Sequence, residues 1–229
     1  VVGIEDFFST AGERRALEEF VEIQTLYNPD LLEWGVAVMS LAVDPTTNIE
    51  LLITGDAQLE NVDAAAANTF FFSTTESDCL EVPSAVTIRT PENIRVTFTI
   101  NGAQIEVGST VMLRTLPPGN VFQLYTVEGN ATLIDPLTGV RTSVLAGQTS
   151  ERCLSQPQNL GDDGEADDLI VYDSCGWTAP VPATAEELAL GRSITQVFTV
   201  IDTPFAPQDP VITAVPTVNA NACPPGFNT

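Results

Sequence analysis

Histidine and lysine are both absent from this chain of 229 residues, and its eight basic residues are all arginine. Without histidine there is no Ser-His-Asp triad and no imidazole general base. Without lysine there is no Schiff base, no phosphate-loop lysine and no Lys–Asn cross-link. Adjacent glutamates such as Glu186 and Glu187 point in different directions, so they do not form the opposed carboxyl pair of a glycosidase. The sequence carries no other catalytic or cofactor signature, and we expect a protein that is not an enzyme.

Long apolar runs and positive charge are also scarce. No run approaches the roughly 20 apolar residues that a membrane-spanning helix needs, so we expect no membrane span. The chain has 31 acidic and 8 basic residues and a formal net charge of −23. Nucleic acid is a poor partner for such a surface, because phosphate binding depends on clustered cations. The acidity favours solubility through mutual repulsion, and the alternative explanations are divalent cations or life in high salt.

Cysteine is infrequent, and its four copies are widely spaced: Cys79, Cys153, Cys175 and Cys223. No CxxC motif occurs, which argues against a zinc ribbon or a redox dithiol. An even number of cysteines in a chain with the character of an exported protein predicts two disulfide bonds. Three pairings exist, and we expect Cys153–Cys175 together with Cys79–Cys223. Each bond would add roughly 2–4 kcal/mol of stability, mainly by restricting the unfolded chain.

The clearest pattern in the chain lies between Ile94 and Val107. Apolar and polar residues alternate over 94–100 and 103–107, on either side of Asn101-Gly102. Alternation is typical of a strand with one buried face, and Asn-Gly favours a type I′ hairpin turn because both residues tolerate a positive φ. Further alternating runs occupy residues 110–115, 121–127, 129–134 and 140–145. We expect an all-β fold of antiparallel sheets that resemble a sandwich or a jelly roll.

The N-terminal part is predicted to form a β subdomain over residues 1–78. A strand at 34–43 would be buried on both faces or bent at Gly35, and strands at 49–54 and 57–62 would pair around Gly55-Asp56. Three consecutive phenylalanines at 70–72 cannot all point one way on a strand. They indicate either a core position or an interface with another molecule.

The second predicted unit, residues 79–202, contains the alternating strands and, near its end, a helical motif. Thr184 followed three residues later by Glu187 forms a capping box, which predicts one short helix near 184–190 that Gly191 ends. The alternation of Ser193–Ile201 predicts a further strand. The third unit is a proline-rich C-terminal tail over residues 203–229.

An acidic loop precedes that helix. A glycine-containing cluster of carboxylates can wrap a hard cation such as Ca²⁺ with oxygen ligands. The spacing does not match an EF-hand, and the alternative is a solvated acidic turn. The candidate ligands are Asp162, Asp163, Glu165, Asp167 and Asp168.

The tail contains a β-prone apolar segment among its prolines. Val211, Ile212, Thr213, Ala214 and Val215 lie between Pro210 and Pro216. Prolines at this density exclude a central strand and favour extended or edge conformations. The segment is predicted either to pack along its own domain or to add a strand to a neighbouring copy of the chain.

One part of the chain resembles a known family. The stretch Val127-Glu128-Gly129-Asn130-Ala131-Thr132-Leu133, then Gly139, then Val144-Leu145-Ala146-Gly147-Gln148 is similar to the repeat of FecR-like β-domains. The resemblance covers roughly residues 85–150. It implies an exported β-module of bacterial envelope proteins, without assigned chemistry. The family's role in signalling for iron transport does not follow, because the chain shows no membrane span.

Two functions are compatible with this sequence. The first is an extracellular structural or adhesive protein, in which copies of the chain assemble through the tail into a surface filament or sheath. The alternative is an extracellular module that binds glycans or Ca²⁺, in which aromatic side chains stack on sugar rings. The aromatic candidates are Trp34, Trp177, Tyr27, Tyr125 and Tyr172.

Overall fold

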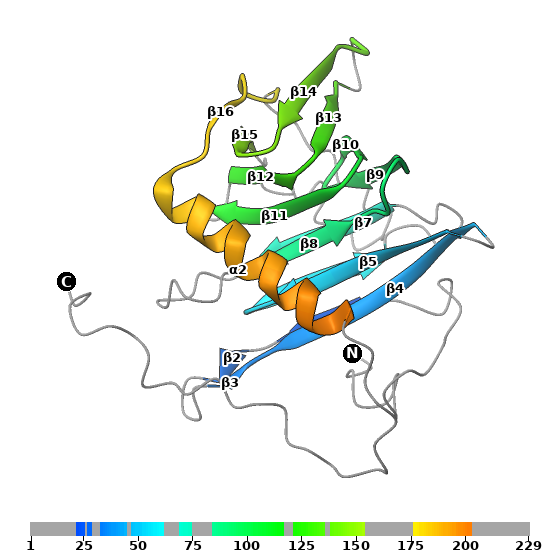
Figure 1. Ribbon diagram of the computed structural model, residues 1–229. Helices are drawn as coiled ribbons and strands as arrows, with labels where there is room; N and C mark the ends of the chain where they lie inside the picture. Colours follow the sequence, from blue (N-terminus) through cyan, green and yellow to red (C-terminus); the bar gives the residue numbers. More distant parts are fainter. Residues whose placement is uncertain are drawn as a thin grey trace, which may run out of the picture.

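The computed structural model describes residues 22–25, 27–28, 33–44, 47–61, 69–74, 84–116, 121–135, 138–153 and 176–202. These residues form two seven-stranded sheets, a two-stranded sheet and one helix (Figure 1). In spatial order, sheet I consists of β1 (Glu22–Thr25), β6 (Ala57–Asn61), β7 (Thr69–Thr74), β9 (Val96–Ile100), β10 (Ala103–Val107), β13 (Asn130–Ile134) and β14 (Arg141–Leu145). Sheet II consists of β16 (Val181–Pro182), β15 (Gln148–Cys153), β12 (Val121–Glu128), β11 (Thr110–Leu116), β8 (Ala85–Arg89), β5 (Thr47–Thr54) and β4 (Val36–Asp44). The small sheet pairs β2 (Tyr27–Asn28) with β3 (Glu33–Trp34), and the helix is α2 (Ala185–Asp202).

The two large sheets share one apolar core. Within them every pair of neighbouring strands is antiparallel except β7 and β9, which are parallel. Phe72 of sheet I and Phe122 of sheet II are both fully buried, with ring centroids 6.4 Å apart. The predicted all-β sandwich is therefore confirmed.

Helix α2 covers the outer face of sheet II (Figure 1). Leu190, Ile194 and Phe198 are buried against a second apolar cluster that includes Leu52 and Met112 of the sheet. Sheet II is thus covered on one face by sheet I and on the other by the helix. This leaves little room inside the described fold for another apolar strand.

The predicted hairpin at Asn101-Gly102 is confirmed. Both residues have positive φ, at 50° and 68°, and β9 pairs with β10 in the register Phe98↔Ile105. The Asn101 side chain is buried, and it accepts a hydrogen bond from the Phe72 N–H and donates one to the Phe72 carbonyl, both at 2.7 Å. The turn residue therefore also joins the hairpin to β7.

The predicted pairing of residues 49–54 with 57–62 is wrong. Strand β5 pairs with β4 and β8 in sheet II, whereas β6 pairs with β1 and β7 in sheet I. Gly55 has a φ of 74°, and a Cβ at this position would lie 2.7 Å from the Ser84 Cα. The tight approach turns the chain from one sheet to the other, whereas alternation in a sequence identifies a strand and not its partner.

The helix starts as predicted but is longer. Thr184 and Glu187 form the capping box, in which the Glu187 N–H donates to the Thr184 Oγ1 at 3.2 Å and the Thr184 N–H donates to the Glu187 Oε2 at 2.7 Å. The helix does not end at Gly191 and continues to Asp202, so the predicted strand at 193–201 is wrong. The reason is the four-residue spacing of Leu190, Ile194 and Phe198, which places three apolar side chains on one helical face.

The structure also bears on the predictions for the strand at 34–43, for the phenylalanines at 70–72 and for the boundary at residues 78–79. Strand β4 starts after Gly35 and alternates between half-buried and exposed residues, so it is not buried on both faces. Phe70 and Phe72 are core residues, as the core interpretation of 70–72 predicts. Both large sheets combine strands from before and after residue 79, and one core includes both groups. The boundary predicted at residues 78–79 therefore does not separate two independent cores, because the strands on either side of it complete the same two sheets.

Candidate functional site

Most residues that the sequence marked as candidates lie outside the described residues. These are the acidic cluster Asp162–Asp168, the segment Val211–Val215 and the cysteines Cys79, Cys175 and Cys223. Cys153 ends β15 and is disulfide-bonded, and which of the other cysteines is its partner stays a prediction. Within the described part of the chain, no group of three or more acidic or cysteine side chains is placed to hold a metal ion. Ca²⁺ binding by the acidic loop also stays a prediction.

A shallow polar depression of about 360 Å³ lies at one end of sheet II. Its centre is a row of residues that face one another across four strands, in the order Glu50, Arg89, Thr110 and Glu128. The Arg89 Nε donates to the Glu50 Oε2 at 2.7 Å, and its guanidinium lies 4.3 Å from the centroid of the Phe198 ring on α2. The lining is completed by Asn48, Thr90, Pro91, Glu92 and Ser109.

The positive charge of Arg89 in the depression is neutralised by Glu50. Because Glu50 pairs with Arg89, the only arginine in the lining is engaged by a carboxylate and by an aromatic face. The same contacts attach the C-terminal half of α2 to the sheet. We interpret the row as a structural contact between helix and sheet, with an open polar rim toward solvent.

A second polar row attaches the start of α2 to sheet II. The Arg114 Nη2 donates to the Glu187 Oε1 at 3.0 Å and its Nε to the Gln123 Oε1 at 2.7 Å, while the Gln123 Nε2 donates to the Glu151 Oε1 at 2.9 Å. Burial by itself would raise the pKa of Glu187. Hydrogen bonds from Thr184 and the charge of Arg114 outweigh burial and hold this pKa below its ordinary value. Glu187 is therefore a buried carboxylate that is kept ionised by its partners.

Two further carboxylates lie on sheet I and have opposite surroundings. Glu106 accepts hydrogen bonds from Arg141 at 2.7 Å and from Arg95 at 3.0 Å, and these bonds lower its pKa. Glu60 is directly opposite Glu22 on the neighbouring strand, and burial and the Glu22 charge raise the pKa of Glu60. Local surroundings therefore account for both groups: Glu106 is held by Arg95, just before β9, and by Arg141 on β14, whereas Glu60 is affected by burial and by Glu22 on the adjacent strand β1.

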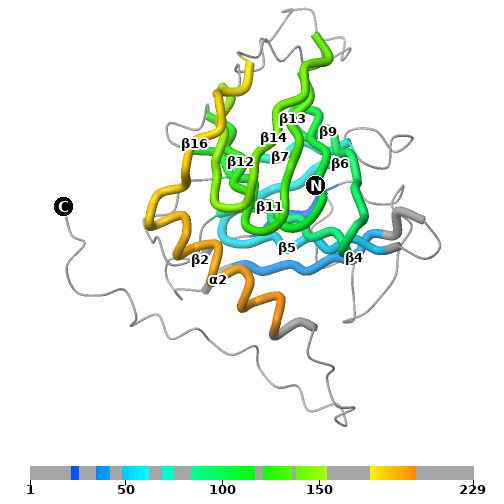
Figure 2. Tube along the Cα trace, turned by 45° about the horizontal axis from the view of Figure 1, so that its top comes forward, coloured from blue at the N-terminus to red at the C-terminus, as the bar shows by residue number. Residues whose placement is uncertain are grey.

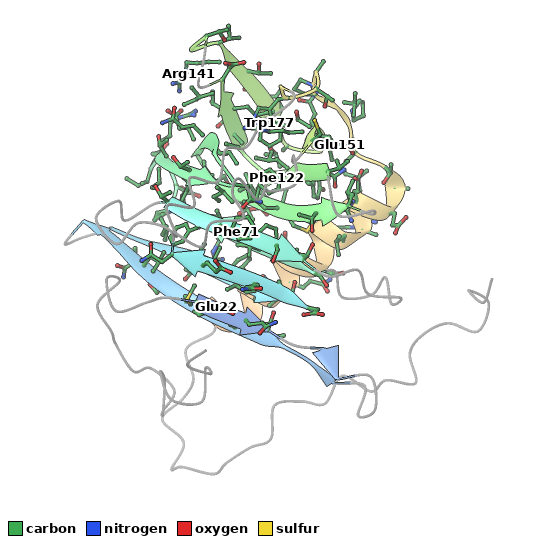
Figure 3. All side chains as sticks on the ribbon, turned by 180° about the vertical axis from the view of Figure 1, so that it is seen from behind. Glu22, Phe71, Phe122, Arg141, Glu151 and Trp177 are labelled. Carbon is green, nitrogen blue, oxygen red and sulfur yellow. The ribbon has the colours of Figure 1, made fainter. Side chains whose placement is uncertain are left out.

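The proposed sugar-stacking residues have limited exposure. Tyr125 is 3% exposed beneath α2. Trp177 is half-buried and lies beside Phe122, with ring centroids 5.7 Å apart (Figure 3). The side chains of Trp34 and Tyr27 and all of Tyr172 lie outside the described set. Tyr125 and Trp177 thus serve the core, as aromatic residues in β-domains commonly do.

The edges of the two sheets differ in how they are protected against pairing with another strand. In sheet I, the edge strands β1 and β14 are short and carry Glu22 and Arg141. In sheet II, the edge strand β16 has two residues, one of which is Pro182. The opposite edge, β4, has nine residues and carries no charge, proline or glycine before Asp44. Charges, prolines and short length are the usual protections of an edge, so β4 is the unprotected edge of the described fold.

Strand β4 also exposes apolar side chains, which the sequence interpretation did not single out. Val36 is 56% exposed and Val38 is 47% exposed, whereas Ala37, Met39 and Leu41 contact the core from the other face. The sequence signal for this site is the uncharged run from Val36 to Val43. An uncharged run of this kind does not distinguish an edge strand from a buried central strand, because both can have the same composition.

Comparisons with known proteins give no relative for this chain. No family model matches it, and neither a curated protein nor a solved structure is similar to it. The FecR-like resemblance of residues 85–150 therefore stays a prediction. In the described residues, no helix has the length and apolar character that crossing a membrane requires.

Proposed function

We propose that the protein is a non-enzymatic structural or adhesive subunit of the cell exterior, and that copies of it assemble into a filament or sheath. The C-terminal segment Val211–Val215 of one copy adds as a strand to the next copy. A contact between a tail and a different surface is heterologous, so it can repeat along a chain of molecules. The disulfide at Cys153 and the FecR-like resemblance support an exported protein.

The observation that carries this proposal is the place where the last described element, α2, ends. Helix α2 ends at Asp202 on the outer face of sheet II (Figure 1), and 27 residues follow it in the sequence. Sheet II is already covered by sheet I on one face and by α2 on the other, so among the described residues its remaining pairing sites are at its edges. The β-prone apolar segment Val211–Val215, which follows the helix in the sequence, has the composition of a strand that can pair at a sheet edge.

The distribution of charge supports the tail as the point of contact. The whole chain has a formal net charge of −23, whereas residues 203–229 contain one acidic residue, Asp209, and no arginine. Copies of the body therefore repel one another, and the tail is the part that approaches a neighbour with the least repulsion. Salt should favour assembly, because at 0.1 M ionic strength it screens the repulsion between charges on neighbouring bodies that are more than about 10 Å apart.

Sedimentation and electron microscopy of the full chain over a range of protein and salt concentrations test this proposal. We expect species that grow with concentration and appear as elongated particles. Ile212→Asp places a charge in the apolar segment and should leave the protein monomeric, while Val218→Asp, in the tail but beyond Pro216, should assemble as the parent does. A parent protein that is monomeric at every concentration and salt would refute the proposal.

A further inference from the structure

We infer that the acceptor for this strand is the outer edge of β4. The segment Val211–Val215 of a second copy pairs with β4 and becomes the eighth strand of sheet II. This inference rests on the proposed function and identifies the surface that it uses. The strand that pairs with β4 comes from the tail of another copy. Four features support this choice: the lack of protection of the β4 edge, the direction of its backbone groups, its side chains, and the course of the chain after α2.

The β4 edge is the one that offers a long and unprotected row of backbone groups. Among the four edges of sheets I and II, the other three are short and carry a charge or a proline. Within the described residues, β4 pairs only with β5, along eight aligned positions. No described strand occupies its opposite side, which is the side at which another strand can pair.

The direction of the backbone bonds identifies the acceptor groups. The Gly55 N–H donates to the Gly35 carbonyl at 3.1 Å, and the register continues through Ala37↔Ile53 and Met39↔Leu51. Along a strand of an antiparallel pair, the backbone N–H and carbonyl groups of alternate residues point toward the partner strand and away from it. The N–H and carbonyl groups of Val36, Val38 and Ser40 therefore point outward, away from β5.

The side chains of β4 match the donor segment on both faces. One face presents Ala37, Met39 and Leu41, which contact the core, and the other presents the exposed Val36 and Val38. In Val-Ile-Thr-Ala-Val, every residue other than the β-branched threonine is apolar, so the segment has apolar side chains for both faces. Prolines 210 and 216 limit the pairing to these five residues, because proline cannot donate a bond to the ladder.

The route of the chain favours a second copy over the molecule's own β4. The last turns of α2 lie beside β4 (Figures 1 and 2), so the tail starts next to its own edge. Residues 203–210 contain prolines at 204, 207 and 210, a spacing that favours a stiff extended spacer. At about 3.1 Å per residue, such a spacer carries the segment roughly 25 Å from the helix end. A stiff spacer does not turn back on itself, so it presents the segment to a neighbour.

The test combines two full-length variants, each of which is expected to be unable to form a continuing assembly by itself. Val38→Lys places a charge on the acceptor edge at a half-exposed position, and Ile212→Asp disables the donor. Each variant alone should self-associate at least about tenfold more weakly than the parent, a factor that corresponds to about 1.4 kcal/mol. An equimolar mixture should form a dimer and nothing larger, because the intact tail of the first variant pairs with the intact β4 of the second. Val140→Lys, at a site that is 59% exposed and outside sheet II, should associate as the parent does.

The outcomes separate this inference from the proposed function. If Val38→Lys assembles as well as the parent while Ile212→Asp does not, the tail uses another acceptor, and the inference is wrong although the function stands. A monomeric parent overturns both, and a tail that folds onto its own β4 would give that result. Circular dichroism shows whether Val38→Lys is folded. If it is not, Ser40→Pro replaces it, since this change deletes an outward N–H and leaves the bonds to β5 in place.

Discussion

The pair formed by Arg114 and Glu187 should be a main link between α2 and sheet II. The perturbation is Glu187→Gln, which keeps the size of the side chain and removes its charge. The amide oxygen can still accept the bonds from Thr184. The amide nitrogen would then face the Arg114 guanidinium, so that two donors oppose each other where an ion pair of 3.0 Å existed.

The expected magnitude follows from the burial of the two side chains. The Glu187 side chain is 8% exposed and that of Arg114 is 20% exposed. Removing one partner of a fully buried pair costs roughly 3–5 kcal/mol. Arg114 retains its bond to Gln123 and some contact with water, so we expect a loss of about 2 kcal/mol in the free energy of unfolding, within the range for a hydrogen bond to a charged group.

The dependence on pH gives a second readout. The folded-state pKa of Glu187 is lowered, so its stabilisation is complete above the unfolded carboxyl pKa of about 4.3. The stabilisation is lost as the pH falls through the folded-state value. The difference in stability between the parent and Glu187→Gln should therefore be large at pH 7 and should shrink below about pH 4.

Urea unfolding followed by circular dichroism measures both effects, in the Ile212→Asp background so that the protein stays monomeric. Glu186→Gln is the matched control, because Glu186 is the exposed neighbour in the same helical turn, and it should change stability by less than about 0.5 kcal/mol. A cycle with Arg114→Gln should give a coupling energy of about 1–2 kcal/mol. Additive effects of the two changes, or a Glu187→Gln loss that is the same at pH 3 and pH 7, would refute the reasoning.

Two further predictions concern turn and packing positions. Asn101→Ala should lower the free energy of unfolding in urea by about 3 kcal/mol, because it leaves the buried N–H and carbonyl of Phe72 on β7 without partners and places alanine at a positive φ. Asn93 is exposed and also has a positive φ, so its change to alanine should cost only about 1 kcal/mol. Gly191→Ala should not stabilise the protein, although alanine normally stabilises a helix by about 1 kcal/mol relative to glycine, because its Cβ would lie 2.7 Å from the Tyr125 hydroxyl. The reverse change at the exposed Ala189, Ala189→Gly, should lower the free energy of unfolding by the usual amount of about 1 kcal/mol. Equal losses for the two asparagine variants, or a stabilised Gly191→Ala, would contradict these explanations.

Local chemistry explains why part of this fold was predictable. The Asn101-Gly102 turn depends on two neighbouring residues that tolerate positive φ, and the start of α2 depends on Thr184 and Glu187 three positions apart. Alternation located most of the strands for the same reason, since the side chains of one strand have a period of two. These features depend on residues close in the sequence, so the sequence is enough to determine them.

Gly191 shows where local reasoning fails. A glycine after a capped helical turn predicts the end of a helix. In the structure its missing Cβ instead allows the helix to approach Tyr125 of β12. The close approach involves a residue 66 positions away, and no local pattern contains that information.

The sequence by itself determined most of the strands, the hairpin turn, the start of the helix and the acidic character of this protein. Only the tertiary structure decided which strands pair, that β5 and β6 belong to different sheets, and that the chain before and after residue 79 completes one core. It also decided that β4 is an edge and not a centre, which is the property the proposed assembly uses. The physical reason is that pairing and burial depend on contacts between residues distant in the sequence, whereas composition and alternation are the same for an edge strand and for a central one.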